Sequence, residues 1–342
     1  MRVCSLLPSA RGPRRRGSGA SPRGSCSRNV SGLRPSTRDV PIALLGYGTV
    51  GSAVDRHLRE HAGALEAATG MHLRVVHALV RDPRKERPYP PLPGVLVTEF
   101  ATIRDDPQIV AVAELMGGLE PAHDYIGELI ERGKGVATAN KQLLARAVGL
   151  LPRVRAGGSV CGAMPILSLL RDGIPAGSVE RISGIVNGTT NFVLTRIECG
   201  SSYDEALAEA QAHGYAEADA TEDVTGADAA AKIAILAATA FRTDVTIADV
   251  SYEGIERVDV ASVRHARASG RAIRLVGVAT RDRAEVRLRE LDASDPLAAA
   301  PSADNVVVVE GAGFRRISLS GPGAGGPETA SAVVADLLEL VR

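Results

Sequence analysis

Residues 40–61 read VPIALLGYGTVGSAVDRHLREH, and this stretch decides the fold of the first half of the chain. The apolar run at 40–45 is typical of a buried parallel strand, and the residues after Gly51 predict a helix through His61. The Gly-x-Gly-x-x-Gly between them permits a tight turn, close approach of a pyrophosphate and close helix packing. We therefore expect a dinucleotide at this loop, although a glycine-rich turn of an unrelated α/β protein has the same pattern. The loop consists of Gly46, Tyr47, Gly48, Thr49, Val50 and Gly51.

The second expected strand, Leu73–Val80, is followed directly by Arg81. An acid at this place would bind the ribose of NAD, whereas an arginine suits the 2′-phosphate of NADP. Arg81 therefore favours NADP as the cofactor. NAD stays open, because Asp82 comes next and because an arginine in a loop needs no ligand.

Alternating strands and helices continue with a buried strand over Ile109–Leu115 and a helix over Pro121–Arg132. A further strand from Gly135 delivers Lys141 at its carboxyl end. Ligands of open α/β sheets bind beyond such ends, so Lys141 is either a site residue or an ordinary solvated lysine.

After Pro152 the pattern changes to a mostly antiparallel sheet that carries the central helices. The fold class is therefore α/β, with a Rossmann dinucleotide-binding domain and an α+β substrate domain. The expected strands are Val179–Val186, Ala272–Ala279, Val286–Leu291, Val306–Val309 and Ile317–Leu319, and a last helix covers Pro327–Val341.

Residues 213–235 read HGYAEADATEDVTGADAAAKIAI and combine an acidic loop with the start of an apolar helix. From Val224 to Phe241 the only charged residues are Asp228 and Lys232, which share one helical face. A helix that is apolar on every side is normally buried, and buried charges are paired or used. The two residues are therefore either an ordinary i,i+4 salt bridge or part of a pocket that holds an ammonium group beside a working lysine.

Composition excludes several classes of protein. The 342 residues suit two domains. Outside residues 1–38, with their nine arginines and no acid, the chain has 31 basic and 40 acidic side chains, a net charge of −9. This acidic body argues against nucleic acid as a partner, and no apolar run of 18 residues suggests a membrane span. The four cysteines lack metal or disulfide spacing, so a cytoplasmic location is expected.

Residues 1–38 are rich in Arg, Ser, Gly and Pro. Such a segment buries too little apolar surface to fold, so we expect a disordered tail. An organelle transit peptide or a basic arm for nucleic acid has a similar composition, but no amphipathic apolar face accompanies the arginines.

Taken together, these motifs resemble the homoserine dehydrogenase family. The resemblance covers nearly everything after residue 39 and is most specific over residues 214–232, which end in Gly-x-Asp-x-x-x-Lys. The other matching motifs are residues 46–51, Thr138–Lys141, Gly184–Asn191, Gly323–Gly326 and Thr329-Ala330.

The resemblance implies a homodimer that uses NAD(P) to interconvert L-aspartate 4-semialdehyde and L-homoserine, for threonine and methionine biosynthesis. It implies a dinucleotide-binding domain at 39–150, a substrate and dimerisation domain at 151–315, and a segment at 316–342 that completes the first domain.

The resemblance also implies roles for individual residues. Lys232 would be the acid/base and Lys141 would lie beside cofactor and substrate. Glu217 and Asp228 would hold the substrate, and Asp223 would support the pocket. The residues expected against the cofactor are those of the 46–51 loop together with Gly117, Lys141, Gly188, Gly214, Glu217 and Gly325.

The chemistry agrees with these roles, because reducing an aldehyde creates a developing alkoxide that needs a cationic donor nearby. A partly buried lysine beside a second lysine is expected to have a lowered pKa, so that it can also act as a base. Nearby acids oppose that shift of the pKa.

The chain departs from the family between Lys141 and Pro165, where it is shorter by about two helical turns. The family binds a monovalent cation through a glutamate and nearby carbonyls, and that glutamate is Gly157 here. Only the backbone carbonyls of Val160, Gly162 and Met164 remain for such a site. Without the regulatory domain that many bacterial members carry, feedback by threonine through such a domain is not expected.

Three interpretations remain. The favoured one is an active homoserine dehydrogenase, because both lysines and the acids are present. The shortened segment borders the site, so a related dehydrogenase for another small semialdehyde is the second. The third is a catalytically weak NADP-binding protein.

Overall fold

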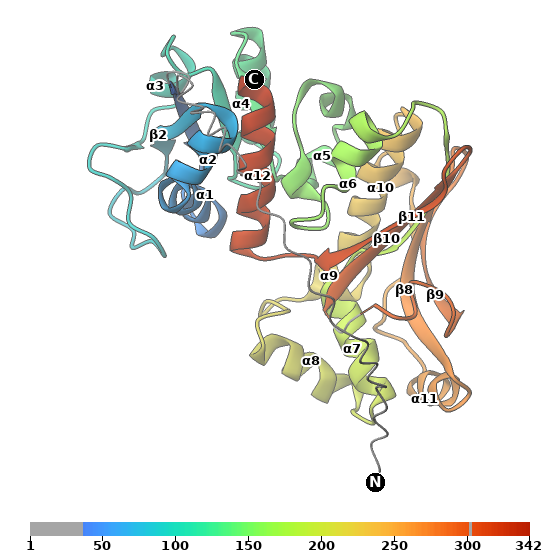
Figure 1. Ribbon diagram of the computed structural model, residues 1–342. Coiled ribbons are helices and arrows are strands. Elements are labelled where there is room, and N and C mark those ends of the chain that lie inside the picture. Colours follow the sequence, from blue (N-terminus) through green and yellow to red (C-terminus); the bar gives the residue numbers. More distant parts are fainter. Residues whose placement is uncertain (1–36, 301–302) are drawn as a thin grey trace, which may run out of the picture. The chain divides into compact units, whose positions relative to one another are not determined.

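The computed structural model describes residues 37–300 and 303–342 (Figure 1). The expected disordered tail lies outside the described residues, apart from its last two positions. Among the described residues, no helix has the length and apolarity that a membrane span requires.

The first half of the described chain forms a five-stranded parallel sheet in the order β3-β2-β1-β4-β5. Strand β1 lies between β2 and β4, so the strand order reverses beside β1. Ligands of such sheets bind at this reversal, beyond the carboxyl ends of the strands. The strands are β1 (Arg38–Leu45), β2 (Met71–Leu79), β3 (Leu96–Val97), β4 (Ala111–Glu114) and β5 (Gly135–Thr138), and the helices are α1 (Thr49–Glu60), α2 (Ala62–Thr69), α3 (Ala101–Arg104) and α4 (Ala122–Glu131).

A second sheet of six strands has the order β11-β10-β6-β8-β9-β7 and is antiparallel except where β7 pairs with β9. The predicted mostly antiparallel sheet is therefore confirmed. The strands are β6 (Val179–Ile185), β7 (Ser251–Tyr252), β8 (Arg271–Ala279), β9 (Ala284–Asp292), β10 (Asp304–Gly311) and β11 (Arg315–Pro322), and the longer helices are α7 (Gly188–Glu198), α8 (Tyr203–Ala212), α10 (Ala227–Phe241) and α11 (Val260–Ala268).

Helix α10 packs closely on this second sheet. A Cβ placed on Gly277 of β8 would come within 2.3 Å of Ile233 Cγ1, so only glycine allows this approach. Thirteen of the fifteen residues of α10 are buried, Asp228 and Lys232 among them. Their two charges are thus held inside the protein, where they need partners.

The predicted helix over Val224–Phe241 is interrupted in the structure. A short helix α9 (Thr221–Val224) ends, and α10 begins after Gly226, whose φ is +83°. A Cβ at Gly226 would lie 2.3 Å from the carbonyl oxygen of Glu253, so the chain turns here for both conformational and steric reasons. The break places Asp228 in the first turn of α10, where the helix dipole favours a carboxylate.

The C-terminal helix α12 (Gly326–Val341) returns to the parallel sheet, as predicted, and lies beside α1 (Figure 1). Its buried residues Val333, Val334 and Leu337 belong to the same apolar cluster as Ile42 and Leu44 of β1.

Short helices fill the segment between β5 and β6. They are α5 (Lys141–Leu144), η1 (Val148–Arg153), η2 (Gly157–Ser159), α6 (Ile166–Ser168) and the π-helix η3 (Leu169–Gly173).

Candidate active site

Lys141, Asp228 and Lys232 meet in one cluster. Lys141 is the first residue of α5, directly beyond β5, whereas Asp228 and Lys232 stand one turn apart on α10. The Nζ atom of Lys141 lies 2.7 Å from Asp228 Oδ1, and the Nζ atom of Lys232 lies 2.9 Å from Asp228 Oδ2. One carboxylate therefore binds both ammonium groups.

The members of this cluster differ in their exposure. The side chain of Lys141 is 33% exposed, that of Lys232 is 9% exposed and that of Asp228 is 3% exposed. Burial alone would raise the pKa of Asp228, but the ammonium groups of Lys232 and Lys141 outweigh it and hold that pKa below its ordinary value. Burial would likewise lower the pKa of Lys141, yet the Asp228 carboxylate raises it. At Lys141 the carboxylate therefore outweighs burial, and the pKa of this lysine lies above its ordinary value.

Asn187 joins Asp228 to a second carboxylate. Its Nδ2 donates to Asp228 Oδ2 (2.8 Å) and to Asp223 Oδ1 (2.7 Å). Thr189 Oγ1 donates to the other oxygen of Asp223 at 3.1 Å. Burial raises the pKa of Asp223. Asn187 also caps α7 by accepting the Thr190 N–H, and the sequence analysis missed its two carboxylate contacts.

The main chain at Val186 holds Lys232 from another side. Lys232 Nζ donates to the Val186 carbonyl at 2.7 Å, and Asn305 Nδ2 donates to the same oxygen at 3.1 Å. Asn305 is fully buried and lies against Gly323, where a Cβ would come within 2.3 Å of the amide. Sequence reasoning missed Asn305, because a single asparagine at the start of a strand carries no signal.

Glu217 and Gly214 lie in the loop before α9 and are both exposed. Among the described residues, nothing hydrogen-bonds the Glu217 carboxylate, although its backbone carbonyl accepts from Gln211 at 3.2 Å. The structure thus brings together four predicted residues, Lys141, Asp223, Asp228 and Lys232, and leaves the side chain of Glu217 outside their hydrogen bonds.

The glycine loop has the form that a dinucleotide requires. A Cβ at Gly46 would lie 2.8 Å from the Leu115 carbonyl, and one at Gly51 would lie 2.3 Å from the Gly46 carbonyl, so both positions need glycine. Nothing lies within 4 Å of a Cβ at Gly48, which leaves space for a phosphate beside the exposed Gly48 and Thr49. The Tyr47 side chain is buried and donates to Asp55 Oδ2 at 2.5 Å.

Buried side chains shape the neighbouring strand ends. Glu114, at the end of β4, accepts from Thr138 Oγ1 (2.6 Å) and from the Met116 N–H (2.8 Å). Asn140 caps α5 and donates to the Gly118 carbonyl at 2.7 Å. These bonds tie the exposed turn at Gly117 to the start of α5, and hence to Lys141. Arg81 is exposed just beyond β2.

Two family models match this chain. The model described as "Homoserine dehydrogenase, NAD binding domain" matches residues 46–157, and the model described as "Homoserine dehydrogenase" matches residues 165–338. The chain belongs to the homoserine dehydrogenase family. The Bacillus subtilis homoserine dehydrogenase is 37% identical over 316 residues, and the Mycobacterium tuberculosis enzyme is 40% identical over 326 residues. Both alignments cover 89% of this chain and 73% of the relative.

A solved structure agrees with these relatives. A homoserine dehydrogenase from Thiobacillus denitrificans superimposes with a TM-score of 0.83 at 37% identity, covering 89% of this chain and 74% of that chain. As a member of the homoserine dehydrogenase family, the chain is an NAD(P)-dependent oxidoreductase that acts on the CH–OH group of a small molecule. It interconverts L-aspartate 4-semialdehyde and L-homoserine, on the route to threonine and methionine.

The segment with the predicted ligands of a monovalent cation is closely packed around Gly157. No side chain fits at Gly157, because a Cβ there would lie 2.9 Å from Asp336 Oδ1. The Gly157 N–H instead donates to Asp336 Oδ2 at 2.7 Å, and the Met164 carbonyl accepts from the Ile166 N–H at 2.8 Å. A carbonyl oxygen has two lone pairs, so the carbonyls of Val160, Gly162 and Met164 stay a prediction as ligands of a monovalent cation.

Proposed function

We propose that Lys232 transfers the proton in the homoserine dehydrogenase reaction, with Asp228 holding it in place. When bound, NAD(P) supplies or accepts the hydride. As the aldehyde is reduced at its carbonyl carbon, the carbonyl oxygen takes a proton from Lys232 Nζ and becomes the hydroxyl of homoserine. In the reverse direction, the hydroxyl proton of homoserine returns to Lys232 Nζ. The observation that carries this proposal is the single Asp228 carboxylate between the two lysines.

Lys141 takes a different role in this proposal. Because its pKa is raised by Asp228, it stays charged and stabilises the negative charge that develops on the carbonyl oxygen. Its position at the carboxyl end of β5, in the same parallel sheet as β1 and its glycine loop, supports contact with both cofactor and substrate.

In this proposal the ammonium group of the substrate is bound by the carboxylate of Glu217, together with those of Asp223 and Asp228. The exposed Glu217 carboxylate, which hydrogen-bonds no other described residue, supports this role. Asp228 already receives both lysines and Asn187, so we propose that it acts first on the lysines and second on the substrate.

Several finer features belong to the same proposal. Arg81 would favour NADP over NAD, and the protein would be a cytoplasmic homodimer that binds neither nucleic acid nor membranes. The domain limits would be 39–150, 151–315 and 316–342, and the change from one family model to the other between residues 157 and 165 supports a first boundary near residue 150. Light scattering coupled to size-exclusion chromatography tests the dimer, with twice the mass of 35.6 kDa as the expected result.

A steady-state assay tests the function itself. The purified chain is expected to oxidise L-homoserine with NADP, and Lys232→Met, prepared in parallel, controls for contaminating host enzyme. Turnover of a different small semialdehyde but not of homoserine would instead favour the related dehydrogenase. Cofactor binding without turnover of any such substrate would favour the weak NADP-binding protein.

A further inference from the structure

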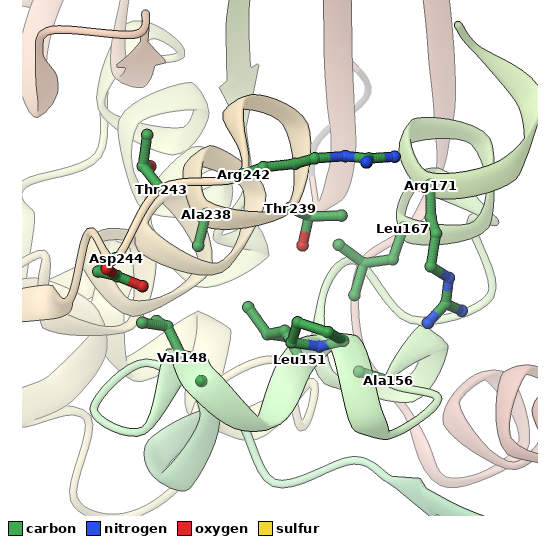
Figure 2. A pocket seen from close by; sticks show the side chains of 12 residues that line it. Val148, Leu151, Ala156, Leu167, Arg171, Ala238, Thr239, Arg242, Thr243 and Asp244 are labelled. Carbon is green, nitrogen blue, oxygen red and sulfur yellow. The ribbon is translucent and has the colours of Figure 1, made fainter. Parts of the chain in front are cut away.

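A cavity of about 420 Å³ lies apart from the lysine cluster. Its walls come from η1, from α6 with η3, and from the last turns of α10 (Figure 2). The apolar part of the lining includes Leu151, Leu167 and Ala238. None of the residues that line it belongs to the cluster of Lys141, Asp228 and Lys232. A volume of this size with mostly apolar walls is typical of small-molecule sites.

Five polar residues join this apolar lining, namely Arg171, Thr239, Arg242, Thr243 and Asp244. Arg171 and Arg242 lie at one end of the view around Leu167, and Asp244 lies at the other (Figure 2). Two guanidinium groups and one carboxylate give the lining a net charge of +1. The cavity therefore favours an anion.

The N–H groups of the Arg242 guanidinium are available to bind a ligand. It caps the C-terminus of α10 in a left-handed conformation, with φ of +53°, and its guanidinium pairs with none of the described residues. Arg171 is partly engaged, because its Nη1 donates to the Val154 carbonyl at 3.0 Å and its Nε contacts Asp172 at 3.3 Å. The neighbouring Thr243 Oγ1 is buried without a hydrogen-bond partner in the described structure. A buried hydroxyl of this kind calls for a polar ligand atom or a water.

We propose that this cavity binds a small organic anion with an apolar body, of which an aliphatic monocarboxylate is the simplest form. The hydrocarbon part would lie on Leu151, Leu167 and Ala238, and the carboxylate would accept from Arg242 through two parallel N–H bonds. Asp244 would repel a second anionic group, so the preferred ligand carries one negative charge.

The ligand would also contact α10, the helix that carries the proposed proton donor Lys232. Ala238 and Thr239 line the cavity, and they lie on α10 about two turns beyond Lys232. The binding site is nevertheless separate from the reacting groups. Its test needs no turnover, and it can fail while the proposed function holds.

The probe is octanoate, titrated calorimetrically into the full-length chain without substrate or cofactor. Saturable binding to one site per chain is expected. Octan-1-ol has the same hydrocarbon body without the charge, and it should bind about tenfold more weakly. Arg242→Gln should weaken octanoate about tenfold, and Ala238→Phe, which fills the cavity, should abolish binding at an unchanged thermal midpoint.

The matched control is Arg257→Gln. Arg257 is also exposed and makes no hydrogen bond to a described residue, but it does not line the cavity. Octanoate should bind this variant as it binds the wild type. The proposal is overturned if the wild type shows no saturable binding, if the alcohol binds as well as the carboxylate, or if Arg242→Gln and Arg257→Gln behave alike.

Discussion

The Asp228 carboxylate stands in the first turn of α10 with a lysine ammonium group on each of its oxygens. A buried charge is tolerated only when it is paired, and losing one partner leaves the others uncompensated. Here one acid neutralises part of the charge of Lys141 and Lys232 and fixes the distance between them. At the scale of single residues, the chemistry of the site depends on this arrangement.

Asp228→Asn should lower kcat by roughly 10²–10³, because the lysines lose the charge that holds them together. The dissociation constant for NADP should change little. Asp223→Asn is the matched control, since Asp223 contacts Asn187 and Thr189 rather than a lysine, and its loss of kcat should be smaller. If Asp228→Asn raises the KM for homoserine and leaves kcat normal, the prediction is wrong. Asp228 would then bind substrate without holding the lysines.

Arg81→Ala should raise the KM for NADP by about tenfold or more, and that for NAD much less, because a guanidinium pairs bidentately with a 2′-phosphate. Arg84→Ala, a nearby exposed arginine, is the control and should alter neither value strongly. Steady-state kinetics with both cofactors measures the difference. Equal effects of Arg81→Ala on NADP and NAD would refute the assignment.

At the scale of elements, α12 and η2 are joined by a buried acid. Asp336 on α12 is 2% exposed and accepts the Gly157 N–H at 2.7 Å. Burial raises its pKa to about 7, and nearby Glu339 adds to the rise. Between about pH 4 and pH 7 the folded protein therefore keeps a proton on Asp336 that the unfolded chain, with an ordinary pKa of about 3.9, has already lost.

This difference makes stability depend on pH with a definite sign. Between about pH 4 and pH 7 the folded state binds more protons at Asp336, so the free energy of unfolding falls as the pH rises. The full effect is on the order of 4 kcal/mol, from about three pKa units. Asp336→Asn cannot lose a proton, so its melting temperature relative to wild type should increase across this range and level off above it. A difference in melting temperature between the two proteins that stays constant from pH 4 to pH 8 would contradict this linkage.

The elements themselves were largely predictable, because each depends on local pattern. The strand over residues 40–45, the glycine loop and the last helix follow from apolar runs and turn residues, and all were confirmed. The error at Gly226 has a tertiary cause, since the close carbonyl of Glu253 is 27 positions away in the chain and no local pattern reports it.

The whole molecule brings together segments that are far apart in sequence. The i,i+4 spacing predicted the pair Asp228 and Lys232, and the structure contains it. The contact between Asp228 and Lys141 spans 87 positions, and that between Gly157 and Asp336 spans 179. Such contacts depend on how β5, α10 and α12 pack. Sequence reasoning therefore proposed most of the site residues, but not Asn187 or Asn305 as partners of the charges.

Deleting residues 1–36 should leave kcat and the thermal midpoint essentially unchanged. The segment is rich in Arg, Ser, Gly and Pro and has little apolar surface to bury, whereas the first strand begins at Arg38. Calorimetry and the homoserine assay on the two forms measure both quantities. A large loss in either would mean that the tail contributes to the folded protein.

The most direct test of the account is the turnover of Lys232→Met beside that of Lys141→Met, with NADP binding and circular dichroism as controls for folding. Methionine keeps much of the length of the lysine chain and removes the ammonium group, with its proton and its charge. Lys232→Met should lower kcat by roughly 10²–10⁴ in both directions with little change in cofactor affinity. Near-normal turnover in Lys232→Met, with the large loss in Lys141→Met instead, would contradict the account and make Lys141 the acid.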